Sequence, residues 1–155
     1  MYWWPLGAVV LHIVEEFVFP GGFAEWDRSY RPQVRSSITP RFHLVVNTVL
    51  VVACVAIGWL GPSPRGVAAW LTIAALLGTN AIFHVVGSFQ TRRYSPGVVT
   101  GVLLYLPLAV YGFVYFLRTG QASPPTALAA LLIGGSYHLW SSLAHAQRAK
   151  ASDSE

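Results

Sequence analysis

Two adjacent glutamates and a histidine lie within an apolar stretch near the start of the chain. Residues 11–23 read LHIVEEFVFPGGF, and His12, Glu15 and Glu16 are the ionisable residues of this stretch. On a helix His12 is one turn from both glutamates, at spacings of i+3 and i+4, so the three side chains share one broad face. Imidazole and carboxylate groups together bind zinc, iron or manganese, and they also serve as general acids and bases. These residues are therefore the first candidates for a reactive site.

The other histidines also fall in stretches that we expect to be helical. They are His43, His84, His138 and His145. Asn47 follows His43 by four residues and Asn80 precedes His84 by four, so each asparagine lies one helical turn from a histidine. An amide at that distance can orient an imidazole ring, which is the support that metal-binding histidines need.

The composition indicates a membrane protein. Hydrophobic residues make up 54% of the chain and charged residues only 10%, whereas soluble domains have about 25% charged residues. Several apolar stretches reach, or with their flanks approach, the roughly 20 residues that cross a bilayer. A charge inside such a stretch is unfavourable, so intramembrane His and Glu usually face the bundle interior and mark a functional site. The single cysteine, Cys54, provides no disulfide framework.

Turn-forming segments divide the chain into predicted helices. Pro, Gly and Ser cluster at residues 20–22, 61–66, 94–97 and 120–125. We predict helices at residues 3–20, 42–60, 66–88, 97–117 and 124–147. The predicted fold is therefore all-α, an integral membrane bundle of five transmembrane helices. We expect a single transmembrane domain over residues 1–147 and a short polar cytoplasmic tail over residues 148–155.

The distribution of basic residues predicts the orientation of the bundle. Eight of the ten Arg and Lys residues fall in the first loop, the third loop and the tail, which five crossings place on one side. By the positive-inside rule that side is cytoplasmic, and the N-terminus is outside. The net charge of +4 fits this topology. The expected partner is therefore a lipid bilayer and not a nucleic acid.

Three sequence blocks resemble the HXXEE-domain family of small bacterial multi-pass membrane proteins. They are HIVEE at 12–16, NAIFH at 80–84 and YSPGVVT at 94–100, and they occur in this order. The resemblance implies a location in the bacterial inner membrane. It implies no substrate. The positions that the resemblance marks are His12, Glu15, Glu16, Asn80 and His84.

The leading functional prediction is a membrane-embedded metal-dependent enzyme that acts on a lipophilic small molecule. The predicted cofactor is a divalent iron, zinc or manganese ion, in a di-iron or a zinc site, and the sequence has no nucleotide cofactor motif. The predicted catalytic groups are Glu15 and Glu16, either of which can face inward. The predicted metal ligands are His12, Glu15, Glu16, His84 and His138. The predicted supporting or substrate-binding residues are Asn47, Asn80, His43, Tyr94 and His145.

Other functions fit the same residues. One is a metal-free isomerase or cyclase in which a buried glutamate donates a proton and His84 or the partner glutamate removes one. Another is an ion conduit or a non-catalytic membrane subunit, although the predicted outer half has no chain of polar groups for a conduit. The histidines nearest the membrane surface, His43 and His145, also fit a purely structural role.

Overall fold

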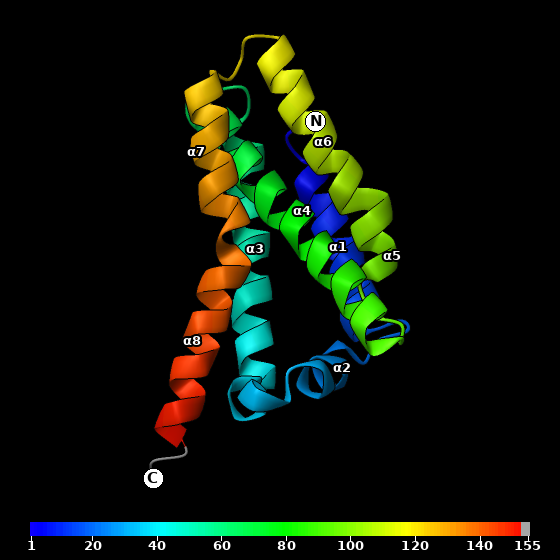
Figure 1. The fold of residues 1–155 in the computed structure, drawn as a ribbon. Helices are drawn as coiled ribbons and strands as arrows, with labels where there is room; N and C mark the ends of the chain where they lie inside the picture. The colour runs from blue at the N-terminus through cyan, green and yellow to red at the C-terminus, as the bar shows by residue number, and fades with distance from the viewer. Residues whose placement is uncertain (153–155) are drawn as a thin grey trace.

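The chain is helical throughout its described part (Figure 1). This computed structural model describes residues 1–152, with side chains described as far as Ala149, and this part contains no strand. The all-α prediction is confirmed. The elements are α1 (Trp4–Phe17), α2 (Phe23–Tyr30), the 3-10 helix η1 (Pro32–Ser37), α3 (Pro40–Leu60), α4 (Pro64–Thr91), α5 (Val98–Thr100), the π-helix η2 (Gly101–Tyr105), α6 (Leu106–Arg118), α7 (Pro124–Gly135) and α8 (Tyr137–Ser152).

Four stretches of the described chain are long and apolar enough to cross a membrane. They are Pro40–Leu60, Pro64–Thr91, Val98–Arg118 and Pro124–Ala149. The prediction of five spans is thus confirmed for four. The first predicted span, residues 3–20, forms a helix of only 14 residues, about 21 Å long, against about 30 Å of hydrocarbon. It ends at Phe17 because Pro20 restricts the residue before it, and because Gly21 and Gly22 have φ angles of 74° and 89°.

Three of the long helices begin with the same sequence signal. A serine or threonine precedes a proline at the first helical position, with Thr39 before α3, Ser63 before α4 and Ser123 before α7. Each side-chain oxygen accepts a hydrogen bond from the backbone N–H three residues later, at 3.2, 3.0 and 3.3 Å respectively. These residues are N-caps, and the prolines occupy the position where a missing N–H costs nothing.

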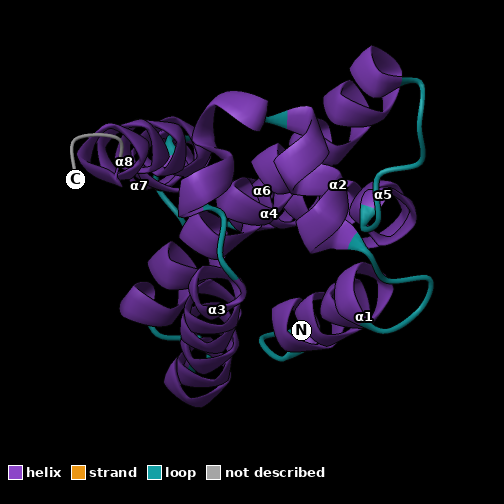
Figure 2. Cartoon of the chain, turned by 90° about the horizontal axis from the view of Figure 1, so that it is seen from below, coloured by secondary structure: helices purple, strands orange, loops and turns teal. Residues whose placement is uncertain are grey.

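The long first loop, residues 21–41, contains helical structure that the turn signals did not predict. α2 lies across one end of the bundle, as the view from below shows (Figure 2). Its Trp26 packs on Gly87 of α4, where a Cβ atom would overlap the indole ring. Asp27 of α2 is fully buried and accepts hydrogen bonds from Arg31 at 2.7 and 2.6 Å. The segment is therefore anchored to the bundle by an aromatic contact and an internal ion pair.

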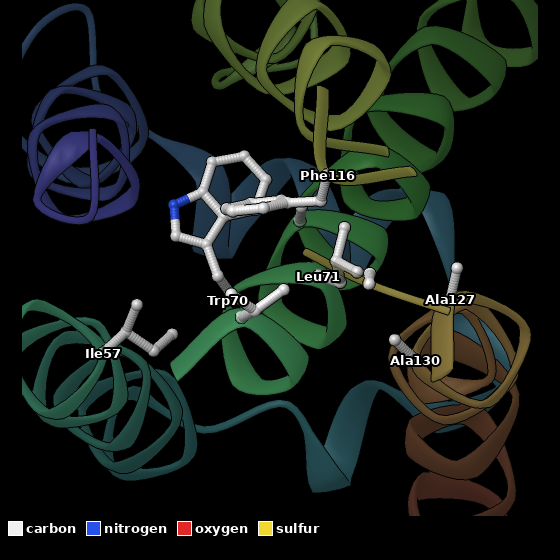
Figure 3. Packing of buried hydrophobic residues seen from close by; sticks show 9 residues of the cluster. Ile57, Trp70, Leu71, Phe116, Ala127 and Ala130 are labelled. Carbon is white, nitrogen blue, oxygen red and sulfur yellow. The ribbon is translucent and has the colours of Figure 1, made fainter. Parts of the chain in front are cut away.

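α4 is the central helix. Half of its most apolar window is buried, compared with 17% for each of the other three spans. Its N-terminal half carries Trp70, which packs against Phe116 of α6 with ring centroids 5.2 Å apart. Ile57 of α3 and Ala127 of α7 complete this apolar cluster from two further sides (Figure 3). The C-terminal half of α4 carries the polar residues of the candidate site.

Large apolar side chains cover much of the outer surface of the described helices. Leu44, Val52 and Ile133 are 68%, 61% and 66% exposed. Surface of this kind on long apolar helices indicates contact with a lipid bilayer. The start of α1 and the end of α8 lie at opposite ends of the molecule (Figure 1). Residues 148–152, predicted as part of a polar tail, continue α8, and residues 153–155 lie outside the described residues.

A pair of neighbouring glycines tests the packing of α7 on α4. A Cβ atom at Gly134 would overlap the carbonyl oxygen of Thr72, so Gly134→Ala should lower the free energy of unfolding by about 1–3 kcal/mol. Gly135→Ala is the matched control, because its Cβ would meet its nearest neighbour at 3.8 Å. This control should be neutral or stabilising by up to about 1 kcal/mol. Thermal unfolding in detergent measures both, and equal midpoints would contradict the close approach of the two helices.

Candidate metal centre

Three buried side chains from two helices converge on one point. His12 and Glu16 come from α1 and His84 comes from α4. Oε1 of Glu16 lies 3.4 Å from Nε2 of His12 and 3.2 Å from Nε2 of His84. One ligand atom from each residue lies within 4.8 Å of the other two, and no other described residues form such a group of His, Cys, Asp or Glu. We call these three residues the His-Glu-His group.

Glu15 points away from this group and binds the start of the next helical stretch. Its carboxylate accepts hydrogen bonds from the backbone N–H groups of Val99 and Thr100, at 3.0 and 2.7 Å, and from the hydroxyls of Tyr94 and Thr100. Helix N-termini favour a negative charge because their first N–H groups are free. Both Glu15 oxygens are therefore occupied, and Glu16 is the glutamate that faces the histidines. These contacts indicate a positioning role for Glu15, which lies outside the His-Glu-His group, and its predicted metal-binding or catalytic role stays a prediction.

Thr100 connects the Glu15 carboxylate to His12. The single hydroxyl hydrogen of Thr100 goes to Glu15, so its oxygen can only accept the hydrogen bond from Nδ1 of His12, 2.8 Å away. This network assigns a proton to Nδ1, and in the neutral imidazole Nε2, the atom that faces Glu16, then carries the lone pair. A carboxylate that orients a histidine from behind is the usual support of a metal-binding imidazole.

His84 is oriented from the turn between α4 and α5. Its Nδ1 lies 2.8 Å from the hydroxyl of Ser95. Its Nε2 is buried and has no hydrogen bond, although Oε1 of Glu16 is only 3.2 Å away. The two atoms are close but not aligned for a hydrogen bond. A buried polar atom without a partner is unfavourable, and a cation between these two atoms would satisfy both.

Gly97 lies directly against the two histidine rings. Its φ angle is 102°, in the region that favours glycine. A Cβ atom at this position would lie 2.7 Å from Cε1 of His84 and 2.8 Å from Cε1 of His12. A side chain here would strain the backbone and push the rings away, so the site geometry requires glycine.

The His-Glu-His group adjoins a cavity of about 280 Å³ that lies among α1, α3, α4 and α8. Asn80 and Tyr105 line the cavity beside the group. The amide nitrogen of Asn80 is 3.1 Å from Nε2 of His12. The ring of Tyr105 packs on the ring of His12, with centroids 4.3 Å apart, and its buried hydroxyl has no hydrogen-bond partner. Tyr105 ends the π-helix η2, an element that is common at functional sites.

The remaining predicted site residues divide between the cavity and other places. His43, Asn47 and His138 line the cavity. His145 does not, because its Nδ1 is 2.6 Å from the hydroxyl of Ser37 and joins α8 to η1. Neither His138 nor His145 belongs to the His-Glu-His group.

Several residues that support the site were not singled out by sequence reasoning. Ser95, Gly97 and Thr100 all lie in the block YSPGVVT, and that block is the sequence feature from which they could have been identified. Asp27 was expected in a loop, and its ion pair with Arg31 at the cavity wall depends on the formation of α2.

Comparison with known proteins decides the family. The family described as "Protein of unknown function with HXXEE motif" matches residues 3–112, and His12, Glu15 and Glu16 are the residues of that motif. The chain belongs to the HXXEE family. This HXXEE protein is 30% identical over 105 residues to the "Uncharacterized protein YrkK" of Bacillus subtilis (strain 168), a match that covers 65% of each chain. No solved structure matches it.

The variant Glu15→Gln tests the positioning role of Glu15. Glutamine cannot replace an ionised acceptor of several hydrogen bonds, so the free energy of unfolding should fall by about 1.5–3 kcal/mol. Glu25→Gln is the control, because the Glu25 side chain is 72% exposed and its replacement should change stability by less than about 0.5 kcal/mol. Burial and the Glu15 carboxylate raise the pKa of Tyr94 above its usual value, so its hydroxyl remains a donor. Similar unfolding midpoints for Glu15→Gln and Glu25→Gln would argue against the positioning role of Glu15.

Proposed function

We propose that this HXXEE protein is a membrane-embedded metal-dependent enzyme that acts on a lipophilic small molecule. His12, Glu16 and His84 are the proposed metal ligands. The observation that carries the proposal is the convergence of their three buried ligand atoms within 4.8 Å. Two histidines and one carboxylate leave coordination positions open for water or substrate, and this donor set suits iron, zinc or manganese.

The distances within the group fit a first-row metal ion. Metal bonds of about 2.0–2.2 Å place neighbouring ligand atoms of a tetrahedral ion roughly 3.4 Å apart. The distances from Oε1 of Glu16 to the two histidine nitrogens are 3.4 and 3.2 Å. The unpartnered Nε2 of His84 and the lone pair assigned to Nε2 of His12 supply the nitrogen donors. Asn80 is the neighbour that must move aside, because its amide nitrogen contacts Nε2 of His12.

The surrounding residues suit chemistry on a lipophilic molecule. A metal in the group would supply Lewis-acid catalysis, or electron transfer if it is iron or manganese. Apolar side chains of α3 and α4 make up much of the cavity wall and exclude water from the substrate. The hydroxyl of Tyr105, buried beside His12 without a partner, is the available proton donor at this end of the cavity. The whole group and Tyr105 lie within the residues that match the family.

Metal analysis of protein purified in detergent and loaded with iron, zinc or manganese tests the proposal. Inductively coupled plasma mass spectrometry should find near-stoichiometric metal in the wild type. Glu16→Gln and His84→Ala should each weaken metal binding by more than about tenfold, because each removes a ligand. His145→Gln is the control, because this buried histidine lies outside the group. This variant should bind as much metal as the wild type.

Size-exclusion chromatography and circular dichroism establish that each variant is folded. A folded wild-type protein that takes up no metal after loading would contradict the proposed metal-dependent function. Proton-transfer chemistry at Glu16 would then be the reaction class to examine, with Tyr105 as its partner in the cavity.

Gly97→Ala gives a second test that leaves every proposed ligand in place. Its Cβ would collide with both histidine rings, so metal affinity should fall by about 10–100-fold, the range seen when ligand support is disturbed. Gly120→Ala is the matched control, because Gly120 also has a positive φ, 69°, but nothing lies within 4 Å of its Cβ. Gly97→Ala and Gly120→Ala both carry backbone strain, but only Gly97→Ala should lose metal affinity. Equal metal affinity in the two variants would contradict the proposed geometry.

A further inference from the structure

Two histidines outside the His-Glu-His group, His43 and His138, also line the cavity, and we call the part of the wall that they form its second polar end. Nε2 of His43 and Nε2 of His138 are buried there without hydrogen-bond partners, and both residues line the cavity. The ring of Phe83 contacts both imidazoles, with its centroid 5.0 Å from that of His138 and 5.6 Å from that of His84. Two unpaired hydrogen-bonding atoms, on residues outside the His-Glu-His group, are therefore available to a ligand in the cavity.

The second polar end offers no free positive charge. Arg31 is the cation among the described residues of the cavity wall, and both of its hydrogen bonds at 2.7 and 2.6 Å go to the carboxylate of Asp27. The other polar groups there, including Asn47 and Ser141, are uncharged. Nε2 of neither histidine is hydrogen-bonded to a carboxylate, and burial of an unpaired imidazolium is unfavourable, which favours the neutral form of both. An ionised carboxylate or phosphate would find no counter-charge at this end.

The rest of the wall is apolar and the space is small. Val46 and Leu50 of α3 and Ile73 and Leu77 of α4 line the cavity. Its volume of about 280 Å³ is at the lower limit of the range for small-molecule sites, about 300–1,000 Å³. The cavity therefore suits one compact molecule or one short chain, and it is too small for a whole phospholipid.

A second hollow adjoins the cavity on the side of the outer surface. It has a volume of about 490 Å³, lies between α1 and α3, and shares His43 and Asn47 with the cavity. Its outer lining includes Leu44 and Val52, which are 68% and 61% exposed. The two helices that flank it are seen from below in Figure 2. The shared residues thus separate the cavity from a surface that faces lipid.

From these observations we infer that the substrate is a neutral lipophile that carries one hydroxyl or carbonyl group. That group hydrogen-bonds to Nε2 of His138 or of His43, and the apolar part of the molecule extends to the His-Glu-His group. The substrate enters from the bilayer between α1 and α3. A neutral imidazole nitrogen donates or accepts, so it pairs with an alcohol or a carbonyl equally well. The inference rests on the proposed function, because it takes the same cavity as the substrate site.

Equilibrium binding of tritium-labelled decan-1-ol and decanoate to the metal-loaded protein in nanodiscs tests this inference. The measurement is made at pH 8, where decanoate is ionised, and the signal of empty nanodiscs is subtracted. The variants are His138→Leu and His43→Leu. The matched control is His145→Leu, because His145 lies on the same helix as His138 and also has an unpartnered Nε2, but does not line the cavity.

We expect saturable binding of the alcohol and at least about tenfold weaker binding of decanoate. His138→Leu or His43→Leu should weaken alcohol binding by about tenfold, through loss of the hydrogen bond, while His145→Leu should not. Decanoate binding as tightly as the alcohol, no saturable alcohol binding, or equal effects of His138→Leu and His145→Leu would each overturn the inference. Metal content is measured on the same samples. Alcohol binding without metal would overturn the proposed function alone, and metal binding without preference for the alcohol would overturn this inference alone.

Discussion

The interaction on which the site depends is the binding of the Glu15 carboxylate to the first N–H groups of the helical stretch that begins with α5. A helix N-terminus presents unpaired donors and a partial positive charge, so a carboxylate in apolar surroundings is strongly stabilised there. Thr100 supplies both a backbone N–H and a hydroxyl to this carboxylate, and its oxygen accepts the hydrogen bond from Nδ1 of His12. One carboxylate therefore joins α1 to α5, orients a histidine and holds Gly97 against both imidazole rings.

The turn before α5 shows how the same sequence signal can serve two purposes. Three Ser-Pro or Thr-Pro pairs cap the helices that follow them through their own hydroxyls. Ser95 also precedes a proline, but its hydroxyl contacts Nδ1 of His84 and makes no cap. Glu15 provides the missing cap from another helix. The hydroxyl of Ser95 is therefore free to orient His84. The Glu15 carboxylate, which caps the helix instead, orients His12 through Thr100.

The unpaired polar atoms show where the interior is prepared for a ligand. Buried polar groups in proteins are almost always hydrogen-bonded, and exceptions mark functional sites or unseen partners. The cavity-lining residues with such atoms are Tyr105, His43 and His138, and Nε2 of His84 adds another beside Glu16. Apolar side chains of α3 and α4 make up much of the remaining wall of the cavity. The pattern matches a molecule with one reactive region and one polar anchor, which is the basis of the proposed substrate class.

The sequence by itself determined the membrane class, the all-α fold, four of the membrane-length helices and the residues of the His-Glu-His group. These features are local, because hydropathy, Ser-Pro caps and the i, i+4 spacing of His12 and Glu16 act within a few turns of one helix. Tertiary structure decided the short α1, the folding of residues 21–41 and the choice between Glu15 and Glu16. Both glutamates lie on the same broad face as His12, so spacing alone does not separate them. The group that separates them is Thr100, 85 residues from Glu15 along the chain, and only the packing of α1 against α4 and α5 brings the two together.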